Sequence, residues 1–277
     1  MPYICPICSA PLTLSDKSWA CVQRHQFDCA KEGYVNLLPV QKKKTKDPGD
    51  NKDMMIARRE FLSRGFYQPL SDQVNLLAAQ YHPNAETLLD IGCGEGYYSH
   101  RLFETIQQSS GEQCKLYGLD ISKSAIRSAA KRYPELQFCV ASVFEMPFAD
   151  KSIDLAIRIY APSKVEELQR VMKPGSTLIT VSPGPMHHFA LKQKIYSQPR
   201  LHPQDSLMLE GFNYLAHESL TYQLTLTQAN DIEHFLNMTP YAWKLSDMQK
   251  RQIIEQGLEC EIDFKIEIHQ REQSSVD

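Results

Sequence analysis

The sequence predicts an α/β fold, a mostly parallel sheet flanked by helices, preceded by a small metal-binding module. From residue 87 onward, short apolar segments alternate with amphipathic helical segments, the pattern of a parallel sheet with helices on both faces. Within the first 30 residues, cysteines gather in a stretch too short to bury a hydrophobic core of its own. The sequence therefore predicts one substantial domain and one minor module.

The composition is that of an ordinary globular protein, with 42% hydrophobic residues, 23% charged residues and a formal net charge of -3. This balance excludes attraction of the whole surface to nucleic acid and leaves room for a local basic patch. No apolar run reaches the ~18 residues that cross a bilayer, and the first residues lack the apolar core of a secretion signal. We therefore expect a cytoplasmic protein without a membrane partner, in which the eight cysteines are metal ligands or buried apolar residues.

Residues 1–40 form the predicted metal-binding module. Its candidate ligands follow the pattern Cys-x2-Cys-x12-Cys-x3-His and are Cys5, Cys8, Cys21 and His25. Three thiolates and one imidazole close a tetrahedral shell around Zn²⁺, so the predicted site is structural. Cys29 is the alternative fourth ligand. Because the ligands are closely spaced, we expect little regular secondary structure between residues 3 and 29.

Residues 41–70 are predicted to be a basic linker followed by a helix. The linker contains a run of lysines, Lys42, Lys43, Lys44 and Lys46, before the turn-forming residues 47–50. A solvated linker is one interpretation of this run. The other is a track for phosphates that continues through Arg24, Lys31, Arg58 and Arg59. Apolar residues at three- and four-residue spacings predict a helix over 54–80, interrupted at Gly65.

Residues 71–277 are predicted to be the catalytic domain. Strands are expected at 87–91, 115–119, 136–140, 153–157 and 177–182, and a final strand pair at 220–227 and 258–269. Helices are expected at 97–108, 124–133, 165–172 and 246–256. Residues 183–218 are predicted to be an irregular insertion.

A glycine-rich turn follows the first strand of this domain. Gly92, Gly94 and Gly96 let the backbone approach a ligand closely at the start of the next helix. Asp120 ends the next strand, where a carboxylate can accept hydrogen bonds from ribose hydroxyls. Asp90 precedes the first glycine, and its carboxylate suits the ammonium group of S-adenosylmethionine better than the pyrophosphate of a dinucleotide.

Several motifs carry a family resemblance. The glycine turn with its two aspartates, Met-Pro-Phe at 146–148 and Val-Met-Lys-Pro-Gly at 171–175 resemble the ordered signatures of class I methyltransferases. Together with the cysteine module and Arg-Ile-Tyr-Ala-Pro at 158–162, they resemble the RlmA family of 23S ribosomal RNA guanine-N1 methyltransferases. The resemblance runs through the whole chain and includes residues 57–62, 65–70 and 238–243.

The resemblance implies a Rossmann-like class I methyltransferase sheet, S-adenosylmethionine and Zn²⁺ as cofactors, and methylation of N1 of a guanosine in the hairpin 35 region of 23S rRNA. The expected cofactor-binding residues are Tyr67, Asp90, Gly92, Gly94, Glu95, Gly96, Asp120, Ser142 and His187. Among them, Tyr67 and His187 follow from the resemblance, and His187 with His188 is alternatively a surface pair. Tyr160 follows the fourth strand, where it orients a flat base or is a core tyrosine.

Two other functions compete with this interpretation. A small-molecule methyltransferase would carry the zinc module without using it, and a non-enzymatic RNA-binding protein would keep only the fold. The intact glycine turn argues against a non-enzymatic RNA-binding protein, and the lysine run argues mildly against a small-molecule methyltransferase. The sequence identifies no general base, and it leaves the oligomeric state open, with a homodimer as one expectation.

Overall fold

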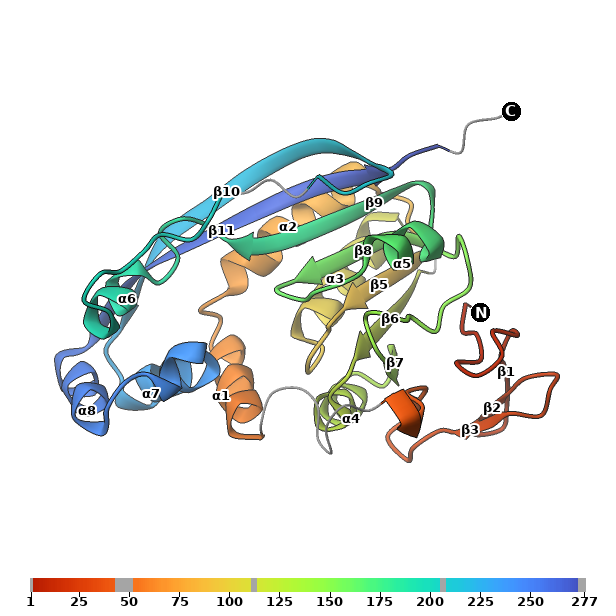
Figure 1. Cartoon of the computed structure of the whole chain (residues 1–277), viewed down its shortest axis with the longest axis horizontal. Helices are drawn as coiled ribbons and strands as arrows, with labels where there is room; N and C mark the ends of the chain where they lie inside the picture. Colours follow the sequence, from red (N-terminus) through yellow and green to blue (C-terminus); the bar gives the residue numbers. More distant parts are fainter. Residues whose placement is uncertain (1, 43–51, 111–113, 205–207, 274–277) are drawn as a thin grey trace.

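The computed structural model describes residues 2–42, 52–110, 114–204 and 208–273. An eight-stranded sheet forms its centre, in the order β10-β11-β9-β8-β5-β6-β7-β4 (Figure 1). The strands are β4 (Val35–Asn36), β5 (Thr87–Ile91), β6 (Lys115–Asp120), β7 (Gln137–Val140), β8 (Ile153–Ile159), β9 (Met172–Pro183), β10 (Phe212–Leu226) and β11 (Leu258–Arg271). The α/β fold expected from the alternating pattern is confirmed.

The strand order places a topological switch point at β5. β5 pairs in parallel with β6 on one side and with β8 on the other, because the chain runs from β5 to β6 and β7 and then crosses back to β8. β11 is the exception, because it runs antiparallel to both β9 and β10. In open α/β sheets, ligands bind outside the carboxyl ends of the strands at such a switch point. The turn after β5 is therefore the place where the fold itself predicts a site.

Helices cover both faces of the sheet. One face packs against α2 (Gln68–Tyr81), α3 (Tyr97–Ser110) and α4 (Lys123–Arg132), and the other against α5 (Val165–Val171) and the N-terminal module. α1 (Lys52–Ser63) packs against α7 (Ala229–Met238), which adjoins α8 (Asp247–Gln256) (Figure 1). None of the helices in the described ranges is long and apolar enough to span a bilayer.

Local sequence signals explain where several helices begin and end. Ser122 caps α4, because its Oγ accepts a hydrogen bond from the N–H of Ala125. Ser246 and Gln249 form a capping box at the start of α8, in which each side chain satisfies the other residue's N–H. Gly65, with φ of 79°, separates α1 from α2 as predicted.

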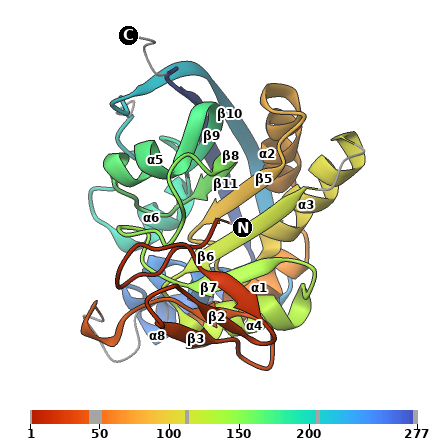
Figure 2. The ribbon, with the colours of Figure 1, turned by 90° about the vertical axis from the view of Figure 1, so that its right-hand side faces the viewer.

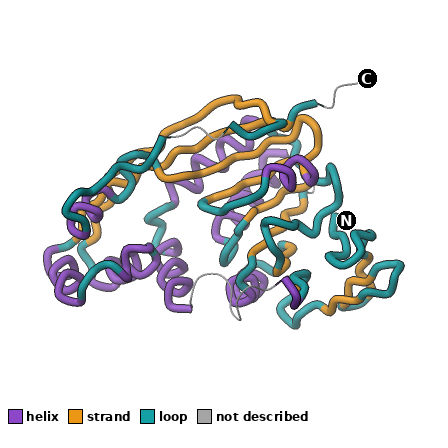
Figure 3. The backbone as a smooth tube through the Cα atoms, in the orientation of Figure 1, coloured by secondary structure: helices purple, strands orange, loops and turns teal. Residues whose placement is uncertain are grey.

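The N-terminal module contains more secondary structure than expected. β1 (Thr13–Ser15), β2 (Ser18–Ala20) and β3 (Gln26–Asp28) form an antiparallel sheet, so the expectation of little regular structure is wrong (Figure 3). Each of these strands has three residues, too few for a pattern of alternating hydrophobicity to be recognised.

The module is joined to the catalytic sheet. β4 adds a parallel edge strand beside β7, and the module lies next to β7 and α4 (Figure 2). The buried ring of Tyr3 packs against Tyr117 and Phe148, with ring centroids 5.4 and 5.2 Å away. The N–H of Ile4 donates to the carbonyl of Pro147 at 3.0 Å. Packing and backbone hydrogen bonds thus fix the module on one face of the sheet.

Residues 183–218 are not uniformly irregular, so that expectation is wrong in part. They contain α6 (Phe189–Ile195) and the first part of β10, which begins at Phe212. The start of β10 is mostly exposed and polar, and it is held by backbone pairing with β11. Because neither face of this segment is buried, its sequence carries no alternating pattern.

Candidate functional site

The glycine turn connects β5 to α3 and leaves open space for a ligand. Gly92 has φ of 77°, and a Cβ there would lie 2.5 Å from Cβ of Ala161, so the turn tolerates only glycine. Gly94 has φ of 55°, and a Cβ there would meet nothing within 4 Å. Gly92 is therefore needed for packing against the turn after β8, whereas Gly94 borders the space that a ligand can fill.

Asp120, at the end of β6, is held beside this turn. Its Oδ2 accepts a hydrogen bond from the N–H of Gly94 at 3.0 Å, and its Oδ1 accepts one from the N–H of Ser122 at 2.8 Å. These bonds fix a carboxylate between the turn and the start of α4, where a ribose can be bound. Ser142 follows β7 at the same edge of the sheet and is half-buried, with its Oγ accepting from the N–H of Phe144 at 3.2 Å.

Asp90 and Glu95 supply the acidic groups of the turn. Asp90 is buried, and Ser99 donates a hydrogen bond to its Oδ2 at 2.6 Å. Burial, opposed by the Ser99 hydrogen bond and aided by the charge of Asp120, raises the pKa of Asp90 to about 7. Within the described residues, Oε2 of Glu95 is buried without a hydrogen-bond partner. An unpartnered acceptor beside open space fits a ligand that brings hydrogen-bond donors.

Arg59 connects the glycine turn with a basic groove. Its guanidinium lies 3.7 Å from Oε1 of Glu95, and it lines a groove of about 480 Å³ between α1 and α4. Lys131 and Arg132 line the opposite side of this groove and are exposed. The lysines at 43, 44 and 46 lie outside the described residues, as does the side chain of Lys42. Of the predicted basic track, Arg59 lies in this groove, which Glu60 also lines, and Lys131 and Arg132 add positive charge that was not predicted from the sequence.

Two tyrosines and two histidines meet beyond the carboxyl ends of β8 and β9. The hydroxyl of Tyr160 lies 3.2 Å from Nε2 of His187, and the hydroxyl of Tyr67 lies 2.9 Å from Nε2 of His188. The two imidazoles stack, with ring centroids 3.8 Å apart. The predicted residues Tyr67, Tyr160 and His187 thus belong to one cluster of side chains, which we call the Tyr–His cluster, and His188 completes it.

β11 holds the turn that carries both histidines. The N–H of Asp263 donates to Nδ1 of His187 at 3.2 Å, and Oδ2 of Asp263 accepts from the N–H of Met186 at 2.8 Å. Both histidines are buried, and burial is the main cause that lowers the pKa of His187 to about 3 and the pKa of His188 well below its usual value. Both imidazoles are therefore neutral at physiological pH.

The predicted metal ligands come together with spacings that suit zinc. Nδ1 of His25 lies 3.5 Å from Sγ of both Cys5 and Cys21, and Sγ of Cys8 lies 3.7 Å from Sγ of Cys21. A tetrahedral zinc, with Zn–S of about 2.3 Å and Zn–N of about 2.0 Å, separates two sulfurs by about 3.8 Å and a sulfur from a nitrogen by about 3.5 Å. The geometry therefore fits zinc, with Nδ1 as the histidine ligand.

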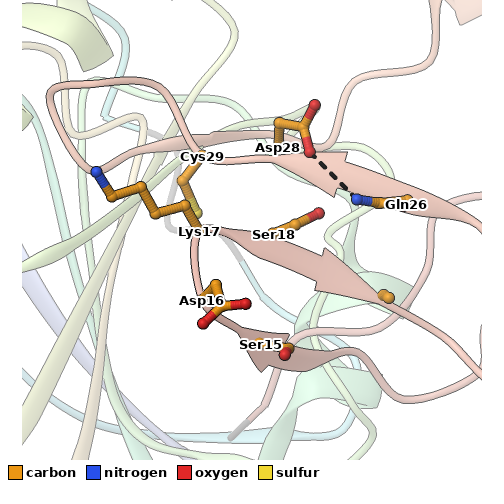
Figure 4. A pocket seen from close by; sticks show the side chains of 8 residues that line it. Ser15, Asp16, Lys17, Ser18, Gln26, Asp28 and Cys29 are labelled. Carbon is orange, nitrogen blue, oxygen red and sulfur yellow. Dashed lines mark hydrogen bonds between the residues drawn. The ribbon is translucent and has the colours of Figure 1, made fainter.

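Cys29 lies outside this cluster. The ligand atoms that lie within 4.8 Å of one another belong to Cys5, Cys8, Cys21 and His25. Cys29 instead borders a hollow on the outer face of the module, together with Ser15, Asp16, Lys17, Ser18, Ala20, Gln26 and Asp28 (Figure 4). One lysine among two aspartates gives this hollow no positive charge, so it is unsuited to phosphate.

Comparisons with known proteins agree with this geometry. Residues 3–46 match the family described as RlmA, N-terminal, a zinc ribbon, and residues 82–239 match a methyltransferase domain family. A Bacillus subtilis protein, provisionally named a 23S rRNA (guanine-N1)-methyltransferase, is 34% identical over 251 residues, which cover 86% of each chain. The chain belongs to the RlmA family of methyltransferases. It is therefore an S-adenosylmethionine-dependent enzyme with a zinc ribbon.

Other relatives extend the RlmA-family comparison. The Streptomyces fradiae 23S rRNA (guanine(748)-N(1))-methyltransferase is 36% identical over 186 residues, which cover 66% of this chain and 64% of that protein. A Micromonospora griseorubida relative, provisionally named for the same type of reaction, is 28% identical over 268 residues, covering 88% of each chain. The crystal structure of a provisionally assigned Bacillus halodurans methyltransferase superposes with a TM-score of 0.50 at 14% identity, covering 73% of this chain and 98% of that one. That structure shares the methyltransferase fold.

Proposed function

We propose that this chain transfers the methyl group of S-adenosylmethionine to N1 of a guanosine in the hairpin 35 region of 23S ribosomal RNA. The observation that carries the proposal is the shared edge of the sheet, where the glycine turn after β5 and the half-exposed ring of Tyr160 after β8 lie next to each other. The RlmA-family relatives named for guanine-N1 methylation support this acceptor.

The proposed cofactor site is the glycine turn and its neighbours. Asp120 binds the ribose, Asp90 faces the ammonium group, and the open space at Gly94 takes the ligand. The full set of proposed cofactor residues is Tyr67, Asp90, Gly92, Gly94, Glu95, Gly96, Asp120, Ser142 and His187. When bound, S-adenosylmethionine supplies an electrophilic methyl group on a sulfonium. The residues of the chain hold the two reactants in line, because orientation contributes much of the acceleration of such a displacement.

The acceptor base is proposed to enter beside Tyr160, whose side chain is 49% exposed while its hydroxyl reaches His187. A guanosine in a folded RNA hairpin must leave its stack to reach this position, and an aromatic ring gives the displaced base a surface on which to pack. This arrangement favours a nucleic-acid base over a small aliphatic acceptor.

The zinc ribbon and the basic groove are proposed to bind the RNA backbone. The zinc ligands Cys5, Cys8, Cys21 and His25 hold the ribbon folded, and Tyr3 fixes it on the sheet. Arg59, Lys131 and Arg132 present positive charge beside the glycine turn, which suits phosphates on either side of the target nucleotide. A ribosomal RNA substrate also implies that the enzyme acts in the cytoplasm. A homodimer stays a prediction.

The proposed substrate can be tested by deleting the gene and mapping modified guanosines in the ribosomal RNA by primer extension. A methyl group on N1 blocks Watson-Crick pairing, so reverse transcriptase should stop at hairpin 35 in the wild type and read through in the deletion strain. An unchanged stop would contradict the substrate. Transfer of the label from S-adenosylmethionine to a small-metabolite extract, and not to unmodified ribosomal RNA, would favour the alternative of a small-molecule methyltransferase.

A further inference from the structure

Tyr160 is held in an uncommon backbone conformation at the site. Its φ is 57°, in the left-handed region that few residues other than glycine adopt. Its N–H donates to the carbonyl of Val181 at 3.1 Å. Such conformations persist only where the surrounding structure fixes them, and they concentrate at functional sites. The direction of the Tyr160 side chain is therefore set by the structure around it.

The hydrogen bonds of His187 fix the position of its ring proton. The N–H of Asp263 points at Nδ1, so Nδ1 carries a lone pair and accepts. A neutral imidazole has one ring proton, which must then reside on Nε2. The N–H at Nε2 consequently donates to the hydroxyl oxygen of Tyr160, 3.2 Å away. The low pKa of buried His187, about 3, keeps the ring neutral at physiological pH.

The hydroxyl hydrogen of Tyr160 is left for another acceptor. The phenol stays protonated, because burial of the hydroxyl and neighbouring tyrosines raise its pKa well above its usual value. Accepting a hydrogen bond from His187 also makes the hydroxyl a stronger donor, since linked hydrogen bonds polarise one another.

This donor lies next to the cofactor turn. Ala161 follows Tyr160 directly and occupies the space in which a Cβ of Gly92 would lie. Tyr98, in the first turn of α3 after the glycine turn, is among the neighbours of the Tyr160 hydroxyl. The exposed ring of Tyr160 therefore lies beside the glycine turn, where an acceptor base has to lie, and its hydroxyl reaches the buried His187.

We propose, resting on the function proposed above, that the Tyr160 hydroxyl donates its hydrogen to O6 of the target guanine, and that His187 is the positioning residue that directs it. When N1 loses its proton to water, the negative charge spreads onto O6, where a fixed donor stabilises it. The electron pair of N1 forms the bond to the methyl carbon, and the bond from methyl to sulfur breaks with its pair on sulfur. Tyr160 keeps its proton throughout.

The test compares two tyrosine-to-phenylalanine variants of the full, zinc-loaded chain. Tyr160→Phe removes the proposed donor and keeps the ring. Tyr214→Phe is the matched control, because the Tyr214 hydroxyl also bonds a histidine, His217, at 2.7 Å, but on the exposed part of β10.

Single-turnover methylation of 23S rRNA from the deletion strain is followed by mass spectrometry of the nucleosides. Tyr160→Phe should slow formation of 1-methylguanosine by about 10- to 100-fold, with S-adenosylmethionine affinity unchanged within about twofold. Tyr214→Phe should match the wild type.

A second measurement tests the positioning role without using activity. Long-range proton–nitrogen NMR spectra of the ¹⁵N-labelled chain should show a bare Nδ1 and a protonated Nε2 on His187 between pH 6 and 8. A proton on Nδ1 would overturn the role of His187, and a Tyr160→Phe rate within about twofold of wild type would overturn the donor role. A wild-type chain that forms no 1-methylguanosine would overturn the proposed function as well, so the two failures are distinguishable.

Discussion

The glycine turn and the Tyr–His cluster adjoin each other, yet they are assembled in different ways. The turn is built from neighbouring parallel strands, and its key bond joins Gly94 to Asp120 at the ends of β5 and β6. The cluster draws Tyr67 from the start of α2, Tyr160 from the end of β8, and His187 from the turn that β11 anchors. A spacing motif therefore encodes the glycine turn, whereas contacts between distant segments build the Tyr–His cluster.

The zinc ribbon is also encoded by spacing, and breaking it should have the largest effect. Cys8→Ala removes one of the clustered ligands, so we expect loss of stoichiometric zinc and unfolding of the ribbon, because structural zinc contributes ~10–16 kcal/mol to the folding of small modules. Mass spectrometry measures the zinc content, and circular dichroism measures the folding of the ribbon. Cys29→Ala, outside the cluster, is the control and should keep its zinc. Full zinc in Cys8→Ala would contradict the ligand set.

Asp120→Ala should weaken cofactor binding alone. The substitution removes the acceptor that binds the N–H groups of Gly94 and Ser122, along with the proposed ribose contacts. At ~1 to 1.5 kcal/mol for each hydrogen bond to the ligand, calorimetry should show S-adenosylmethionine binding weakened by about 10- to 100-fold. Asp16→Ala, on the exposed face of the ribbon, should bind normally. Unchanged affinity in Asp120→Ala would rule out this placement.

The raised pKa of Asp90 makes both the stability of the fold and the binding of the cofactor depend on pH. Its pKa is about 7 in the folded chain against 3.8 ordinarily, so burial of the carboxylate destabilises the fold increasingly as pH rises from about 4 to about 7. Binding a cationic ligand requires the ionised form. Affinity should therefore fall by about tenfold per pH unit below pH 7.

The matched variant for this pH dependence is Asp90→Asn. It should bind S-adenosylmethionine weakly with little slope between pH 5.5 and 7, and chemical denaturation at pH 8 should show an unfolding free energy higher by about 4 kcal/mol. Calorimetric titrations across that range measure the slope. If the wild type and Asp90→Asn show the same slope, the carboxylate does not face the ammonium group.

The smallest effect is expected in the Tyr–His cluster itself. Tyr67→Phe removes a buried hydrogen bond to His188, so urea denaturation should show a loss of about 1–2 kcal/mol in unfolding free energy. S-adenosylmethionine affinity should change far less than in Asp120→Ala, because the Tyr67 hydroxyl already has a protein partner and the proposed contact of Tyr67 with the cofactor is made by its ring. An equally large loss of affinity would instead place this hydroxyl on the cofactor and blur the contrast between the glycine turn and the Tyr–His cluster.

The fold was predictable wherever the pattern is local. The predicted limits of β5, residues 87–91, match the structure, because a short apolar run bounded by turn residues defines a buried strand. The prediction was wrong for the start of β10, where exposed residues from Asn213 onward are held by pairing with β11. It was also wrong for the three-residue strands of the ribbon. The partner of β10 is distant in the chain, whereas the ribbon strands pair with close neighbours but are too short to show a periodic pattern.

The same distinction applies to the site. The zinc cluster and the glycine turn follow from residue spacing, whereas the contact of His187 with Asp263 depends on how β9 pairs with β11, and that of His188 with Tyr67 on the placement of α2. Nothing near His187 in the sequence indicates that Asp263 donates to its Nδ1. The adjacent histidines after Pro183 were the one local signal, and they left a surface pair as an equal interpretation. Only the structure shows that both are buried.

The most direct test of the central claim is methylation of defined RNA by the purified chain. The zinc-loaded protein would be incubated with methyl-labelled S-adenosylmethionine and 23S rRNA from the deletion strain, and the digested nucleosides would be separated. We expect the label in 1-methylguanosine alone, located in hairpin 35 by a new reverse-transcriptase stop and absent when the RNA comes from the wild type. Label in another nucleoside, or no label in RNA despite normal cofactor binding, would contradict the account.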